Sequence, residues 1–170
     1  MSITLVLGGA RSGKSRYAEH LCLDNRVFVA TAQAFDVEMT QRIALHRQRR
    51  GGDWMTVEAP LALMDALRAN DQAERWVLVD CLTLWLSNLM LAEKDCEAEF
   101  AALEHWAGLA KGHIVFVTNE LGLGLVPETA LGRRFRDLHG MMNQRVAAVA
   151  DTVVLVVAGL PLAFKGALPK

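Results

Sequence analysis

The stretch Gly8-Gly9-Ala10-Arg11-Ser12-Gly13-Lys14-Ser15 decides the fold, because it matches the pattern GxxxxGK[ST] over its full length. It directly follows the apolar run Ile3–Leu7, which predicts a buried strand, and it precedes a helical pattern that begins at Tyr17. In this context, backbone N–H groups of small residues curl around phosphate oxygens, and the helix N-terminus adds the positive end of its dipole. The stretch therefore predicts a phosphate-binding loop between a strand and a helix.

Two side chains of this loop and one acid further along the chain predict how the phosphates are held. Lys14 is expected to reach the β and γ phosphates, and the hydroxyl of Ser15 to hold Mg²⁺. Such sites need a second metal anchor, usually an acid at the tip of a nearby strand. Asp80 ends the apolar run Trp76–Val79 and suits that role, although it can also cap a helix that starts near Leu82. We expect Mg²⁺ to arrive with GTP or ATP, and no permanently bound metal.

Further apolar, β-branched runs alternate with helical patterns along the chain. The runs that predict strands are Arg26–Ala30, Trp76–Val79, His113–Thr118 and Thr152–Val157. Most are continuously apolar, as in parallel strands covered on both faces. Asp95 begins one helical pattern that ends at Lys111-Gly112, with an apolar stripe at Phe100, Leu103, Trp106 and Leu109. A second stripe, Leu131, Phe135, Leu138, Met142, Val146 and Val149, predicts a long helix up to about Ala150.

This alternation predicts an α/β fold similar to P-loop NTPases, with a mostly parallel β-sheet and helices on both faces. No linker or repeat divides the chain, so we expect residues 1–170 to form a single nucleotide-binding domain.

Composition limits the class of protein. The chain has 170 residues, 52% hydrophobic residues and a formal net charge of −1, which excludes a disordered chain and does not favour a nucleic-acid partner. The apolar stretch Trp76–Ala92 contains Asp80 and is too short for a membrane helix. The three cysteines have no CxxC spacing and are typical of reduced cytosolic thiols. We expect a cytoplasmic protein with no signal peptide and no membrane insertion.

The segment Asp36–Arg50 predicts an amphipathic helix stopped by Gly51-Gly52. His46 shares a face with Met39 and Ile43 and has arginines one turn away on either side. Nearby positive charge disfavours the imidazolium form and keeps a neutral, nucleophilic nitrogen available. A helical histidine among arginines is, however, more often an ordinary surface or half-buried residue. From the residues alone, the chain is a P-loop phosphotransferase with a candidate histidine nucleophile.

Several motifs, in order along nearly the whole chain, resemble those of the bifunctional adenosylcobinamide kinase / adenosylcobinamide-phosphate guanylyltransferase family of cobalamin biosynthesis. Beside the loop Gly8–Ser15, they are Ala30-Thr31-Ala32-Gln33, Arg42-Ile43-x-x-His46-x-x-x-Arg50 with Trp54 and Glu58, Asp80-Cys81-Leu82-Thr83-Leu84-Trp85 with Asn88, Thr118-Asn119-Glu120-x-Gly122-x-Gly124-x-Val126-Pro127, and Arg136-Asp137-x-x-Gly140-x-x-Asn143-Gln144. Gly51 departs from the pattern, because relatives often have proline there.

The resemblance implies two reactions. A nucleoside triphosphate phosphorylates the hydroxyl on the aminopropanol arm of adenosylcobinamide, and GTP then transfers GMP to His46 and on to adenosylcobinamide phosphate, giving adenosylcobinamide-GDP. It also implies a homotrimer. The nucleotide contacts that it implies are Gly8, Gly9, Ala10, Arg11, Ser12, Gly13, Lys14, Ser15, Ala30, Thr31, Ala32, Gln33, Arg47, Gln48, Arg49, Arg50, Glu58 and Asp80.

Two other functions remain open at this stage. A different small-molecule P-loop kinase, with His46 merely structural, predicts phosphoryl transfer without a covalent nucleotide adduct. A GTP-binding regulatory module predicts slow hydrolysis, no acceptor and nucleotide-dependent partner binding. Asn119-Glu120 follows a predicted strand, where α/β enzymes place ligand residues, or it belongs to an ordinary connecting loop.

Overall fold

The computed structural model describes residues 1–33 and 53–168 and contains, within them, one seven-stranded sheet in the order β3-β2-β4-β5-β1-β6-β7. Neighbouring strands are parallel except for β7, which pairs with β6 in antiparallel fashion. The strands are β1 (Ser2–Gly8), β2 (Arg26–Ala30), β3 (Trp54–Glu58), β4 (Trp76–Asp80), β5 (His113–Asn119), β6 (Thr152–Val157) and β7 (Leu160–Lys165). This confirms the predicted fold class.

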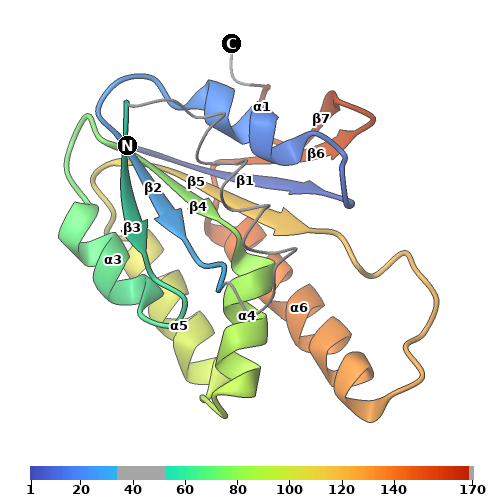
Figure 1. Ribbon diagram of the computed structural model, residues 1–170. Coiled ribbons are helices and arrows are strands. Elements are labelled where there is room, and N and C mark those ends of the chain that lie inside the picture. The colour runs from blue at the N-terminus through green and yellow to red at the C-terminus, as the bar shows by residue number, and fades with distance from the viewer. Residues whose placement is uncertain (34–52, 169–170) are drawn as a thin grey trace.

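Helices cover both faces of the sheet. In Figure 1, α1 lies above the sheet, while α3, α4, α5 and α6 lie below it. Their bounds are α1 (Lys14–Leu21), α3 (Leu63–Asn70), α4 (Leu82–Leu91), α5 (Cys96–Ala107) and α6 (Ala130–Val149). All parallel strands point their carboxyl ends toward one edge, so that edge collects the loops that follow β1, β2, β3, β4 and β5.

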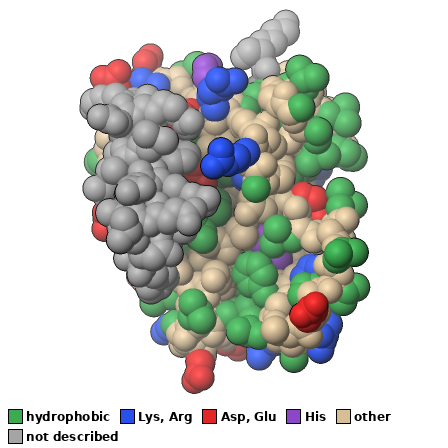
Figure 2. Space-filling view, turned by 45° about the vertical axis from the view of Figure 1, so that its right-hand side comes forward, with side chains coloured by type: hydrophobic (Ala, Val, Ile, Leu, Met, Phe, Trp, Pro, Cys, Tyr) green, Lys and Arg blue, Asp and Glu red, His purple; other side chains and the backbone are tan. Residues whose placement is uncertain are grey.

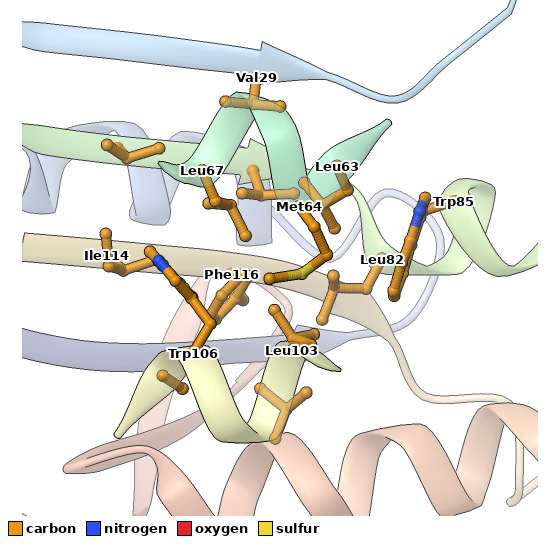
Figure 3. Packing of buried hydrophobic residues seen from close by; sticks show 14 of the residues in the cluster. Val29, Leu63, Met64, Leu67, Leu82, Trp85, Leu103, Trp106, Ile114 and Phe116 are labelled. Atoms are coloured by element: carbon orange, nitrogen blue, oxygen red, sulfur yellow. The ribbon is translucent and has the colours of Figure 1, made fainter. Parts of the chain in front are cut away.

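The core consists of two layers, one on each face of the sheet. The larger layer packs side chains of alternate strand positions, such as Val29, Ile114 and Phe116, against α3, α4 and α5 (Figure 3). Trp85 and Leu103 are almost fully buried in it. The smaller layer, under α1, contains Val6, Ala18 and Val117. Burial on both faces explains why these strands are continuously apolar in sequence.

Two strands were not predicted, and both lie at the edges of the sheet. In β3, Met55 is 52% exposed, and in β7, Phe164 is 68% exposed, so neither strand has the apolar run of a covered strand. The turn between β6 and β7 is formed by Ala158 and Gly159, which both have positive φ, as in tight hairpin turns.

The two predicted helices of the carboxyl half are present, with differences at their ends. The side chain of Asp95 caps α5 by accepting the N–H of Ala98, as predicted. That helix ends at Ala107 rather than at Lys111-Gly112, and Leu109 beyond it is 64% exposed. In α6, Leu131 is 60% exposed, because the first turn extends past the sheet, whereas Met142 and Val146 are buried as predicted.

The predicted helix Asp36–Arg50 lies outside the described residues. Among the residues that the structure does describe, no helix is long and apolar enough to cross a membrane. All three cysteines are buried free thiols. Burial raises the pKa of the Cys22 and Cys81 thiols to about 12, so neither is a nucleophile at neutral pH.

Candidate nucleotide-binding site

The loop between β1 and α1 requires glycine at two of its positions, Gly8 and Gly13. A Cβ atom on Gly8 would lie 2.4 Å from Ser12 Oγ and 2.7 Å from the carbonyl oxygen of Val156, so this position has no room for a side chain. Gly13 has a φ of 94°, which also favours glycine. The amide of Ser12 donates to the carbonyl of Gly9, which closes the loop at 3.3 Å. These two glycines and this hydrogen bond together give the tight loop that is typical of phosphate-binding sites.

Lys14 and Ser15 begin α1 and remain partly accessible. Lys14 Nζ donates to the carbonyl oxygen of Gly9 at 3.1 Å, so its ammonium group folds back over the loop. Ser12 Oγ is buried without a hydrogen-bond partner in the part of the chain described here. A charged group above the loop and an unsatisfied hydroxyl beside it fit an anionic ligand at this helix N-terminus.

The turn between β6 and β7 contacts the phosphate loop directly. The amide of Gly159 donates to the carbonyl oxygen of Ser12 at 2.8 Å, and the Cα of Gly159 would lie 3.3 Å from a Cβ on Gly13. A hairpin that the sequence did not predict is therefore part of the wall of the loop.

Strand register aligns three of the predicted ligand residues at the carboxyl edge. Ala30 is the register partner of Glu58 on β3 and of Asp80 on β4, so the three form one row across adjacent strands. Glu58 is exposed and Asp80 partly exposed. The cap of α4 is Cys81, with no side-chain hydrogen bond, so the alternative that Asp80 caps this helix is wrong. Only β5 separates Asp80 from β1 and its loop.

Thr31 joins the ends of β2 and β4. Its hydroxyl donates to the carbonyl oxygen of Cys81 at 2.7 Å and accepts the amide of the same residue at 2.8 Å. The side-chain amide of Asn88 donates through Nδ2 both to the carbonyl oxygen of Thr31, at 2.8 Å, and to the carbonyl oxygen of Pro60, at 2.9 Å. Thr31 as a whole residue is 0% exposed. Its hydroxyl therefore positions the backbone beside Asp80 and is not free to contact a nucleotide.

A buried polar network under the end of β5 was not recognised from the sequence. It consists of Thr83, Thr118, His139 and Asn143, each at most 8% exposed. Thr83 Oγ1 accepts the amide of Asn119 at 2.9 Å and contacts His139 Nε2 at 3.0 Å. Thr118 donates to Asn143 Oδ1 at 2.9 Å, and Asn143 Nδ2 donates to the carbonyl of Asn119 at 3.1 Å.

The network has a consistent direction of hydrogen bonding when His139 is neutral. Thr83 accepts the Asn119 amide, so its own proton can be donated to His139 Nε2. Burial lowers the pKa of His139, and the carboxylate of Glu120 opposes that shift only in part. The network therefore holds the backbone of Asn119, next to the phosphate loop, in one position. In the sequence, Thr83, Thr118 and Asn143 stand in the motifs quoted above, and His139 lies one helical turn before Asn143.

Of the predicted site residues, the structure brings together the loop Gly8–Ser15 and the row Ala30, Glu58 and Asp80 at one edge of the sheet (Figure 1). Ala32 and Gln33 follow β2 at the same edge and are partly buried. The remaining predicted residues lie outside the described part of the chain: His46, Arg47, Gln48, Arg49 and Arg50.

The fold and the phosphate loop at the carboxyl edge of the sheet define a P-loop nucleotide-binding protein. Solved structures agree on the fold: the flagellar accessory protein FlaH from Methanocaldococcus jannaschii superposes with a TM-score of 0.55 at 13% identity, covering 97% of this chain and 78% of that one. An ATPase of a bacterial type III secretion system superposes with a TM-score of 0.58 at 14% identity, covering 95% of this chain and 56% of that one. At these identities the likeness concerns the fold alone.

The chain belongs to the cobinamide kinase / cobinamide phosphate guanyltransferase family, whose model matches residues 4–164. It is 48% identical over 167 residues to the bifunctional adenosylcobalamin biosynthesis protein CobP of Pseudomonas aeruginosa, covering 95% of this chain and 96% of that protein. It is 39% identical over 178 residues to the protein CobU of Escherichia coli, which carries the same description, covering 95% and 98%. The resemblance seen in the sequence motifs is thereby confirmed.

Proposed function

We propose that this chain catalyses both reactions of its family: phosphorylation of adenosylcobinamide by a nucleoside triphosphate, and transfer of GMP from GTP to the resulting phosphate through His46. The observation that carries the proposal is the complete phosphate loop at the end of β1, one strand away from the acid Asp80, in a chain with this family membership.

In the kinase reaction, the acceptor hydroxyl forms a bond to the γ phosphorus while the bond to the bridging oxygen breaks, and the hydroxyl proton is lost. The products are a phosphate ester and a nucleoside diphosphate. Charge spreads over the phosphoryl oxygens during this step, and Lys14 and the loop amides are placed to stabilise it. The phosphate donor is ATP or GTP.

In the guanylyl transfer, a neutral nitrogen of His46 forms a bond to the α phosphorus of GTP, and pyrophosphate leaves. The phosphate of the acceptor then attacks the same phosphorus, the P–N bond breaks, and the histidine is restored. Positive charge from Arg47, Arg49 and Arg50 would neutralise the polyphosphate.

The donors available at the site suit Mg²⁺ shared with the nucleotide. The hydroxyl of Ser15 and the carboxylate of Asp80 are hard oxygen ligands on partly exposed residues, and the described residues contain no cluster of three or more His, Cys, Asp or Glu side chains that would hold a metal by itself. When bound between these two residues and the phosphates, Mg²⁺ would neutralise phosphate charge. Ala30–Gln33 and Glu58 complete the proposed nucleotide contacts, and Glu58, as an acceptor, suits a ribose hydroxyl or the base.

The test is intact-protein mass spectrometry after incubation with GTP and Mg²⁺, on the wild type and on His46→Ala. We expect an acid-labile adduct with the mass of GMP in the wild type and none in the variant, while the variant keeps part of the kinase activity. A protein that binds GTP but forms no adduct would be a plain kinase or a nucleotide-dependent switch. Equal loss of both activities in His46→Ala would indicate a binding or folding role for the histidine.

From the same resemblance we infer a single-domain subunit that works as a homotrimer in the cytoplasm. Light scattering of the purified protein at several concentrations measures the number of subunits directly.

A further inference from the structure

A pocket of about 380 Å³ opens between α6, the end of β1, the start of β6 and the segment after β5. Its apolar lining is formed by Leu7, Ala147 and Val153. Its polar lining comes from Glu120, Arg136 and Gln144, together with His139 and Asn143 of the buried network. A carboxylate, a guanidinium and an amide together can accept from N–H groups and donate to carbonyl groups. The lining therefore suits a ligand that carries primary or secondary amides.

The pocket adjoins the phosphate loop. Leu7 is the residue before Gly8, and the amide of Glu120 donates to the carbonyl oxygen of Gly8 at 3.3 Å. Of the other nucleotide contacts proposed above, those in the described part of the chain lie on or directly after β2, β3 and β4, and β5 separates these strands from β1. A group bound in the pocket would thus approach the phosphates from the side that the nucleoside leaves free.

Gly140 lies on the pocket wall in the middle of α6. A Cβ on this residue would meet no atom within 4 Å, so no neighbour in the described chain requires glycine here. Glycine destabilises a helix interior relative to alanine. An open space above a helical glycine, in a lined pocket, points to a ligand that occupies the space.

The loop between β5 and α6 extends the site with an apolar surface. Its side chains Leu123, Leu125 and Val126 are 89%, 96% and 63% exposed. Figure 2, which turns the right-hand side of Figure 1 forward, shows hydrophobic side chains on this side of the molecule. Arg136 donates to the carbonyl of Leu125 at 3.4 Å, and Arg133 donates to that of Glu128 at 2.7 Å, so α6 holds the loop beside the pocket.

We propose that this pocket binds the amide-linked aminopropanol arm of the corrinoid acceptor, with the macrocycle lying outside against the loop Leu121–Pro127. This inference rests on the proposed function and names the acceptor side of the same site. A volume of about 380 Å³ is at the lower end for ligand pockets and fits one arm rather than the whole macrocycle. The arm bears the reacting hydroxyl, and the pocket directs that hydroxyl toward the phosphates above Lys14.

The experiment is equilibrium dialysis of adenosylcobinamide against the full chain, followed by visible absorbance of the corrin, on four proteins. Gly140→Leu fills the pocket from a position with free space, and Glu120→Gln removes the carboxylate but keeps its shape. Ala148→Leu is the matched control, because Ala148 is exposed on the same helix outside the pocket. The GMP adduct formed from GTP, which needs no corrinoid, and the melting temperature are measured in parallel.

We expect Gly140→Leu to weaken corrinoid binding by about tenfold or more, and Glu120→Gln by about three- to tenfold, because a lost polar partner leaves its counterpart unpaired. Ala148→Leu should bind within about twofold of the wild type, and all four proteins should form the adduct. Wild-type binding by both pocket variants would overturn the assignment while leaving the proposed function intact. A wild type that binds no corrinoid would overturn the proposed function, and this inference with it.

Discussion

Replacing Thr31 by valine tests the claim that its hydroxyl holds the ends of β2 and β4 together. Valine keeps the shape of the side chain and removes only the polar atom. The two hydrogen bonds to Cys81, at 2.7 and 2.8 Å, are then lost. The Cys81 carbonyl still accepts the backbone N–H of Trp85 at 3.1 Å, so the group that loses its partner is the buried Cys81 N–H. Leaving this N–H unsatisfied costs about 1–3 kcal/mol and losing the second hydrogen bond costs about 1 kcal/mol, so we expect the free energy of unfolding to fall by about 2–4 kcal/mol.

Urea denaturation followed by far-UV circular dichroism measures this loss. Thr31→Ser is the matched control, since it keeps the hydroxyl and removes one methyl group, which costs about 1 kcal/mol. With an m-value of about 2 kcal/mol/M, Thr31→Val should lower the midpoint by about 1–2 M urea and Thr31→Ser by about 0.5 M. Equal losses in the two variants, or a loss below about 1 kcal/mol in Thr31→Val, would refute the claim that the Thr31 hydroxyl holds the ends of β2 and β4 together.

Two further predictions concern charge at the site and beneath it. Lys14→Ala should lower both the kinase rate and the yield of GMP adduct by roughly 100-fold or more, because the ammonium group stabilises the polyphosphate in both reactions; a kinase rate near wild type would contradict the loop assignment. Burial lowers the pKa of His139 in the folded state, so the unfolded chain takes up the proton first as pH falls below about 6.5. The free energy of unfolding should then fall by up to about 1.4 kcal/mol per pH unit from this group, and His139→Gln should reduce that slope in urea titrations from pH 7 to 5. An unchanged slope would mean that His139 has the same pKa in the folded and the unfolded chain.

The central strands and the phosphate loop were predictable because their cause is local. A strand covered on both faces must be continuously apolar, and a loop that wraps phosphate must carry glycines where a Cβ would clash, as at Gly8. The edge strands β3 and β7 escaped prediction for the converse reason. Their side chains face solvent at least in part, so the sequence carries no burial pattern there.

Much of the site depends on register, which the sequence does not state. Asp80 could be assigned from its place after a strand, but its alignment with Ala30 and Glu58 results from which strands are neighbours. The network around His139 is harder still to predict. A buried histidine satisfied by two threonines looks, in sequence, like any polar residue on a helix, since its partners are 21 and 56 residues away.

The order of the strands separates the parts of the chain that the two proposed reactions use. The polyphosphate is expected above β1, and the chain between β2 and β3 that carries His46 leaves and rejoins the sheet on one side of that strand. The pocket at Gly140 is lined by residues of β1, of β6 and of the segment after β5, away from β2 and β3. Under the proposed function, a hydroxyl held in this pocket would approach the γ phosphorus away from β2 and β3, the two strands between which His46 lies in the sequence. Next to β1, β5 ends at Asn119, whose backbone is fixed by Thr83 and Asn143, so α4 and α6 both hold this strand end beside the phosphate loop.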